Sequence, residues 1–320
     1  MSRGDWLENL RRSRRFSRDL AFEYFVMGVA TLTLVLVWAL VARMIFDSQS
    51  SIDRFGASFL WGSSWNPNQD VYGALPFIAG TLTTTLLALL IGVPLSVGIA
   101  IYLAELAPPW LKNPLSFVVE LLAAVPSVIY GLWAMYALRP IMADSVEPFF
   151  KSFLGWTPLF QGDSIGLDKF TAGVILAIMI IPTIASVSKE ALMAVPDSQR
   201  EAALSLGATR YETTRIAVLS YARSGIFGAV ILGLGRAVGE TMAVTMTIGN
   251  ANGISWSLLD PGQTMASLIA NNWGEAQGLQ LSALIEIGLV LFVVALIINV
   301  FARLIVGRFM KRIPAAGGGL

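Results

Sequence analysis

The sequence contains no cysteine and no histidine, and only 13% of its 320 residues are charged. The chain therefore has no thiol nucleophile, no disulfide and no imidazole, and it lacks the usual ligands of zinc, copper and haem. Soluble domains carry roughly 25% charged residues, so the low charge nearly excludes a soluble enzyme. The net charge of +1 provides no excess of positive charge for nucleic acid. We expect no cofactor, metal site, catalytic residue or nucleic-acid partner.

Long hydrophobic runs dominate what is present, because 55% of the residues are hydrophobic. A helix needs about 20 mostly apolar residues to cross the hydrocarbon core of a membrane. Six stretches meet this length: residues 25–46, 74–103, 115–138, 170–188, 225–248 and 279–306. The sequence therefore predicts an all-α integral membrane protein with six transmembrane helices, in which Pro94, Pro126 and Pro182 produce kinks.

Lysine and arginine are distributed unequally over the connecting segments. With the N-terminus in the cytoplasm, sixteen of these residues lie on the inner side and five on the outer side. We therefore expect both termini in the cytoplasm. The outer side then receives two long loops, residues 139–169 and 249–278, which are either docking sites for an external partner or plain connectors. The basic segment 5–20 is typical of a helix lying on membrane lipid or of a solvated arm.

The inner loop between the fourth and fifth stretches carries two helix-start signals. Ser198 and Glu201 form one S-x-x-E capping box, and Thr209 and Glu212 form another. Gly207 lies between them and suits the left-handed position that follows a helix. The pattern predicts a short helix, a turn at Gly207 and a second helix. The small apolar residues of the first helix are typical of a segment that enters a groove on another protein.

Glu201, Ala202 and Ala203, followed by Gly207, resemble the EAA loop of ABC importer permeases. Leu219 is followed by serine, where that family usually has proline. The resemblance implies a type I ABC importer permease fold. It also implies that the loop, residues 189–223, docks on an ATP-binding subunit and transmits its closure to the transmembrane helices.

The fifth stretch contains two opposite charges, Arg236 and Glu240, four residues apart. On a helix this spacing places both side chains on one face. Even low estimates assign about 2.5–3.5 kcal/mol to an arginine near the bilayer midplane, so Arg236 should face protein or a water-filled path. Two interpretations remain open. One is a buried ion pair that fixes helix register; the other is an anion path that uses Arg236, with Glu240 as its alternate partner and the Thr241 hydroxyl nearby.

Residues 235–244, GRAVGETMAV, closely resemble the corresponding span of the PstC-type permeases of bacterial phosphate-specific ABC importers. The likeness covers roughly residues 74–303. It implies phosphate import through the bacterial inner membrane, with Arg236 and Glu240 in the substrate path. It also implies three kinds of partner: a second, homologous permease of PstA type, two ATP-binding subunits and an external phosphate-binding protein.

We divide the chain into an N-terminal arm with the first helix and an external loop (1–72), a permease core (73–305) and a cytoplasmic tail (306–320). The core is expected to hold five transmembrane helices. The sequence has no G-x-x-x-x-G-K-[ST] motif, so ATP must be bound by a partner rather than by this chain.

Other functions are compatible with parts of this pattern. A permease of the same architecture could carry sulfate or molybdate, and a proton-coupled carrier could use Glu120, Glu240 and Glu286 as a relay. An intramembrane hydrolase would need a base beside Ser127 or Ser186, and none has a recognisable spacing. Otherwise we expect Glu120 and Glu286 to be packing partners of a hydroxyl group or of Arg236.

Overall fold

The computed structural model of the protein describes residues 3–311, and the side chains of residue 20, residues 22–304 and residue 307. Its helices are α1 (Arg3–Asp47), α2 (Gln49–Phe55), α3 (Ser58–Trp61), α4 (Leu75–Ile101), α5 (Pro109–Ala124), α6 (Ser127–Trp133), α7 (Arg139–Ile141), α8 (Glu147–Leu154), α9 (Lys169–Met193), α10 (Asp197–Ser205), α11 (Arg210–Thr213), α12 (Leu219–Gly239), α13 (Met242–Thr247), α14 (Met265–Asn272) and α15 (Gly278–Lys311). Short π-helical and 3-10 turns connect several of them.

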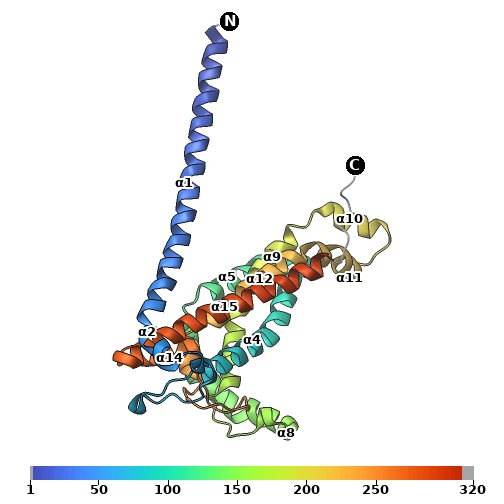
Figure 1. Ribbon diagram of the computed structural model, residues 1–320. Helices are drawn as coiled ribbons and strands as arrows, with labels where there is room; N and C mark the ends of the chain where they lie inside the picture. Colours follow the sequence, from blue (N-terminus) through green and yellow to red (C-terminus); the bar gives the residue numbers. More distant parts are fainter. Residues whose placement is uncertain (1–2, 312–320) are drawn as a thin grey trace.

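The long helices other than α1 form a bundle with α10 and α11 at one end and α8 and α14 at the other (Figure 1). In the described part of the chain, five helices are long and apolar enough to cross a membrane, and a pair of helices bent by 95° adds a sixth span. The expected all-α membrane fold is confirmed, with six spans when the bent pair is counted as one. The last helix is longer than expected, because α15 continues to Lys311.

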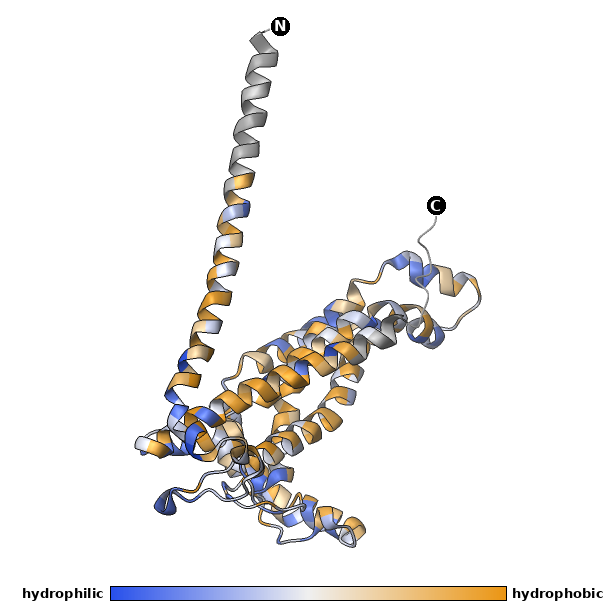
Figure 2. Ribbon diagram, in the orientation of Figure 1, coloured by the Kyte–Doolittle hydropathy of each residue, from blue (hydrophilic) through white to orange (hydrophobic). Residues whose placement is uncertain are grey.

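Helix α1 stands apart from the bundle along most of its length (Figure 1). Its apolar part is largely exposed; Trp38, for example, is 71% accessible. Figure 2 shows many hydrophobic residues along this part of the helix. At its far end α1 is fixed to the bundle, because the Ser282 hydroxyl on α15 donates a 3.0 Å hydrogen bond to the Asp47 carbonyl. Such an exposed apolar surface is typical of a helix surrounded by lipid.

Helices α4 and α9 pack closely in the centre of the bundle. Gly92 of α4 lies against Ile180, and a Cβ atom at this glycine would be 2.9 Å from the Cδ1 atom of Ile180. Gly173 of α9 lies in the same way against Leu87 of α4. Membrane helices gain little from the hydrophobic effect between them, so small residues that allow close van der Waals packing fix such contacts.

The third span, expected over residues 115–138 with a kink at Pro126, is broken into two helices. Helix α5 begins at Pro109 and ends at Ala124, and the chain then bends by 95° into α6. Pro126 causes the break, because the residue before a proline is driven to an extended conformation and Val125 has ψ 129°. The second limb continues through α7 and α8 to Leu154, so half of the expected loop 139–169 is helical.

The two long segments at the α8 end interlock. The backbone N–H of Leu258 donates to the Leu159 carbonyl at 2.7 Å, and Phe170 donates to the Leu258 carbonyl at 2.9 Å. The Nζ atom of Lys169 donates to the carbonyl of Ser255 at 2.6 Å. The segments predicted as separate loops therefore pack together and cover the beginning of α9.

The first of these two segments contains two fully buried carboxyl groups, Glu147 and Asp168. Asp168 caps α9 and accepts a 2.8 Å hydrogen bond from the backbone N–H of Thr171, whose hydroxyl donates to Glu147 at 3.2 Å. Burial, and then the neighbouring Glu147 carboxylate, raise the pKa of Asp168 from 3.8 to about 7.

The α4–α9 contact provides a test of helix packing. Replacing Gly92 with valine should destabilise the protein by about 1–3 kcal/mol, because the added side chain overlaps Ile180. Gly98 lies on the same helix with no atom within 4 Å of its Cβ position, so Gly98→Val is the matched control. The unfolding midpoints of the two purified variants are measured by thermal unfolding in detergent. Equal midpoints would contradict this packing.

The buried Asp168 predicts a pH-dependent stability. Below pH 4 both the folded and the unfolded chains are protonated at this position; between pH 4 and about 7 only the folded chain keeps the proton. Stability should therefore fall as pH rises through that range. Asp168→Asn keeps a good capping residue and removes the titration. Its midpoint, relative to the unmodified protein, should rise between pH 5 and pH 8; a constant difference would contradict the shifted pKa.

Candidate functional site

Arg236 lies in the last turn of α12 and is half-buried. Its Nη1 atom donates a 2.9 Å hydrogen bond to the Thr183 hydroxyl on α9. The carbonyl end of a helix favours a positive charge, which helps to keep the guanidinium in this position. Thr183 was not among the residues predicted for the site. The signal for it was weak: a hydroxyl group one residue after Pro182, inside an apolar stretch.

Glu240 lies just beyond the end of α12, so the continuous helix assumed for the two charges stops between them, and the described structure has no ion pair between Glu240 and Arg236. Helix α12 ends at Gly239, and Glu240 is extended, with φ −68° and ψ 128°. Its Oε1 atom accepts a 3.3 Å hydrogen bond from the backbone N–H of Ala243 in α13. The carboxylate thus satisfies a backbone donor that the helix break leaves without a partner.

Among the residues that the structure describes, no ion pair joins Arg236 to Glu240 or to another acidic side chain. One donor of the Arg236 guanidinium is used by Thr183. A guanidinium has five N–H donors in a planar fork, which matches two oxygens of a phosphate or carboxylate. The geometry therefore favours an arginine that remains able to bind an anion over a charge neutralised within the chain.

A second helix break lies beside the first. Helix α13 packs on α6, where a Cβ atom at Gly131 would be 2.7 Å from the sulfur of Met246. The Tyr130 hydroxyl donates a 2.8 Å hydrogen bond to the Leu122 carbonyl, which also accepts a 3.4 Å bond from the backbone N–H of Val125 and lacks its usual i+4 donor because Pro126 has no N–H. Thr241 stands at the start of α13, and its backbone carbonyl accepts a hydrogen bond from the Thr245 hydroxyl. Broken helices that meet around a charged group are typical of substrate sites in transporters.

Two other carboxylates have separate surroundings. Glu120 on α5 accepts a 3.0 Å hydrogen bond from the Nζ atom of Lys189 on α9. Lys189 was not one of its expected partners. Glu286 on α15 is buried, and its Oε2 atom has no hydrogen-bond partner in the described structure. Neither is bonded to Arg236, so that alternative was wrong, and the partner of Glu120 is a lysine and not a hydroxyl group. The sequence could not identify Lys189, because the pair is 69 residues apart.

The loop between the fourth and fifth spans contains the predicted turn. Helix α10 is followed by Gly207 with φ +85°, in the left-handed region that favours glycine. Thr209 and Glu212 form the expected capping box, with reciprocal hydrogen bonds of 3.3 and 2.8 Å. The capping box predicted at Ser198 and Glu201 is absent. Helix α10 begins at Asp197, so Ser198 is already helical and cannot act as the N-cap residue.

The surface of this loop is exposed and partly apolar. Glu201 and Ala202 are exposed, Ala203 is half-buried, and Leu206 is 90% accessible. An apolar side chain as exposed as that of Leu206, next to a turn of fixed conformation, can be buried against another protein.

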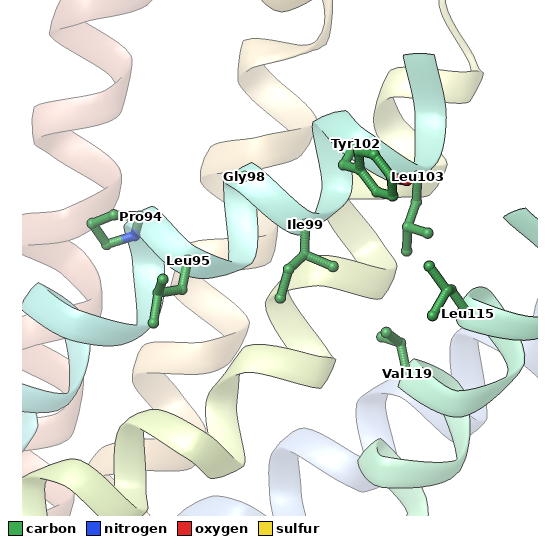
Figure 3. Close-up of a pocket in the computed structure, with 8 residues that line it drawn as sticks. All are labelled: Pro94, Leu95, Gly98, Ile99, Tyr102, Leu103, Leu115 and Val119. Atoms are coloured by element: carbon green, nitrogen blue, oxygen red, sulfur yellow. The ribbon is translucent and has the colours of Figure 1, made fainter. Parts of the chain in front are cut away.

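A cavity of about 510 Å³ lies between α4 and α5 (Figure 3). Its lining is formed by Pro94, Leu95, Gly98, Ile99, Tyr102, Leu103, Leu115 and Val119. The only polar side-chain group in this lining is the Tyr102 hydroxyl, so the cavity offers no charge to an anion. This cavity is therefore not a candidate site for an anion.

Comparison with known proteins agrees with this architecture. The family described as "Binding-protein-dependent transport system inner membrane component" matches residues 92–313. The phosphate transport system permease protein PstC of Pasteurella multocida is 44% identical over 298 residues, which cover 92% of this chain and 93% of the relative. PstC of Haemophilus influenzae is 46% identical over 286 residues, covering 88% and 91%.

A solved structure has the same fold. It is a bacterial ABC transporter involved in the import of the acidic polysaccharide alginate, with a TM-score of 0.58, 18% identity, and coverage of 92% of this chain and 99% of that chain. The ABC importer permease fold expected from the EAA loop is thus confirmed. These relatives are transport components, as expected for a chain without a nucleotide-binding motif. The chain belongs to the family of binding-protein-dependent transport system inner membrane components and, within it, to the PstC permeases.

Proposed function

We propose that this protein is the transmembrane permease subunit of an ATP-driven importer that moves inorganic phosphate into the cytoplasm. The assignment of phosphate as the substrate rests on the 44% identity with a phosphate transport permease over 92% of the chain. A permease for sulfate or molybdate would share the fold, and the test below compares phosphate with sulfate.

We place the phosphate path beside Arg236, Glu240 and Thr241. Arg236 supplies the positive charge, and its hydrogen bond to Thr183 orients the guanidinium while leaving other donors for the anion. Glu240 keeps α13 capped next to the path. Its negative charge limits how tightly an anion is held, which helps release.

The protein needs partners to act. We infer that α10, with Glu201, Ala202, Ala203 and the turn at Gly207, docks on one of two ATP-binding subunits. A second, PstA-like permease supplies the other half of the path, and an external phosphate-binding protein delivers the anion to the α8 end. This assignment places the α10 end and both termini in the cytoplasm, as the distribution of basic residues requires. It retains residues 73–305 as the permease core.

The charge of Arg236 provides the test of the path. Arg236→Gln should lower phosphate uptake by about 30-fold or more, because removing a charge partner costs the bound anion about 2 kcal/mol or more. The assembled complex should form in normal amounts, since no carboxylate of the described chain loses an ion pair. Radiolabelled phosphate uptake into proteoliposomes measures the effect, with excess sulfate as competitor and Arg54→Gln, an exposed residue of α2, as control.

Two outcomes would contradict this assignment. If Arg236→Gln with Glu240→Gln restores uptake, Arg236 serves only to balance Glu240. If sulfate competes as well as phosphate in the unmodified protein, the substrate is a different oxyanion.

The turn at Gly207 provides the test of docking. Gly207→Val should strain the left-handed turn by about 1–2 kcal/mol or more and reduce both co-purification of the ATP-binding subunit and ATPase stimulation. Gly207→Asn is the matched control, because asparagine tolerates this conformation and should retain both. Equal loss in the two variants, or none in either, would exclude the turn as the docking element.

A further inference from the structure

Arg200, in the first half of α10, is fixed by an unusually complete set of hydrogen bonds. Its Nη2 and Nε atoms donate to the two carboxylate oxygens of Glu105 at 2.8 and 3.4 Å. Nη1 donates to the Val195 carbonyl at 2.5 Å, and Nη2 also donates to the Leu192 carbonyl at 3.1 Å. The exposed Asp197 accepts a further bond at 3.2 Å.

The pair is shielded from water, with side-chain exposures of 20% for Arg200 and 12% for Glu105. Surface ion pairs contribute little to stability, but a two-pronged arginine–carboxylate contact with reduced exposure fixes geometry as well as distance. Glu105 belongs to the π-helical turn that continues α4, and Leu192 belongs to the last turn of α9. One side chain of α10 therefore holds the ends of two transmembrane helices.

Apolar packing contributes little to this connection, because none of the nine described residues of α10 is buried. Helix α4 packs closely on α9, and α9 carries Thr183, which holds Arg236. A continuous set of contacts thus leads from α10 through Arg200 and Glu105 to the candidate anion site.

We propose that the Arg200–Glu105 pair is the joint that transfers the movement of α10 to α4 and α9. The proposal rests on the proposed function, since it assumes that an ATP-binding subunit moves α10. The two residues act as positioning residues and do not touch the transported anion. A hollow of about 260 Å³ adjoins the pair and gives its side chains room to change orientation.

The experiment uses the complete transporter in proteoliposomes and measures phosphate uptake and ATP hydrolysis in the same vesicles. Arg200→Gln and Glu105→Gln should each keep the ATP-binding subunits bound and ATP hydrolysis active, while phosphate moved per ATP falls about fivefold or more. Lys112→Gln is the matched control, because Lys112 lines the same hollow and has no ion pair with Glu105 in the described structure. This control should keep the ratio unchanged.

The exchanged pair, Arg200→Glu with Glu105→Arg, tests whether the contact itself is needed and should recover part of the ratio. Unchanged ratios in both single variants would overturn the joint. Loss of the ATP-binding subunits from Arg200→Gln would also overturn it, because the pair would then maintain the docking surface and not transmit its movement.

A second measurement does not depend on which anion is carried. The chain has no cysteine, so spin labels can be attached through Leu90→Cys on α4 and Leu296→Cys on α15, which are both exposed. With cysteine-free partners, ATP should change the distance between the labels in the otherwise unmodified protein and in Lys112→Gln, but not in Arg200→Gln. A full change in Arg200→Gln would overturn the joint. The unmodified complex could show the expected distance changes and still take up no phosphate. That outcome would overturn only the proposed substrate.

Discussion

A chain in hydrocarbon must satisfy its own backbone hydrogen bonds, and the positions where this protein interrupts its helices follow from that requirement. The third and fifth spans break between α5 and α6 and between α12 and α13, and the two shorter limbs pack on each other. At one break the Tyr130 hydroxyl satisfies a carbonyl of α5, and at the other the Glu240 carboxylate satisfies an N–H of α13. The breaks are therefore satisfied by protein groups, which allows non-helical backbone to lie beside Arg236.

The same requirement gives different partners to the two charges that the sequence places together. Glu240 acts as a cap, so Arg236 has a neutral hydroxyl as its partner within the described chain. An arginine inside the membrane costs about 2.5–3.5 kcal/mol. A hydrogen bond from a charged group to a hydroxyl returns about 1.5–3 kcal/mol, and the end of a helix adds about 0.3–1 kcal/mol. The remainder is small enough for water or a bound anion to supply, and this balance suits a group that binds and releases its ligand.

The features that could be predicted from the sequence are those fixed over short stretches. Continuous apolar runs of about 20 residues identified the spans. The Thr209–Glu212 spacing together with Gly207 identified the turn after α10, because the capping box and the turn depend on neighbours within a few residues. The break at Glu240 could not be predicted, since a charge pair at this spacing is equally typical of a continuous helix. Ser198 was assigned as a cap because the start of α10 at Asp197, after Pro196, was not recognised. The Arg200–Glu105 contact joins residues 95 positions apart and required the folded bundle.

The central claim is that Arg236 faces a water-accessible path that phosphate enters. Because the chain has no cysteine, Thr183→Cys places a single thiol beside this arginine. In the assembled transporter with cysteine-free partners, a small water-soluble thiol reagent should modify this cysteine. Phosphate should slow the modification, and sulfate should not. A thiol that water-soluble reagents cannot reach, or a rate that phosphate leaves unchanged, would contradict the account.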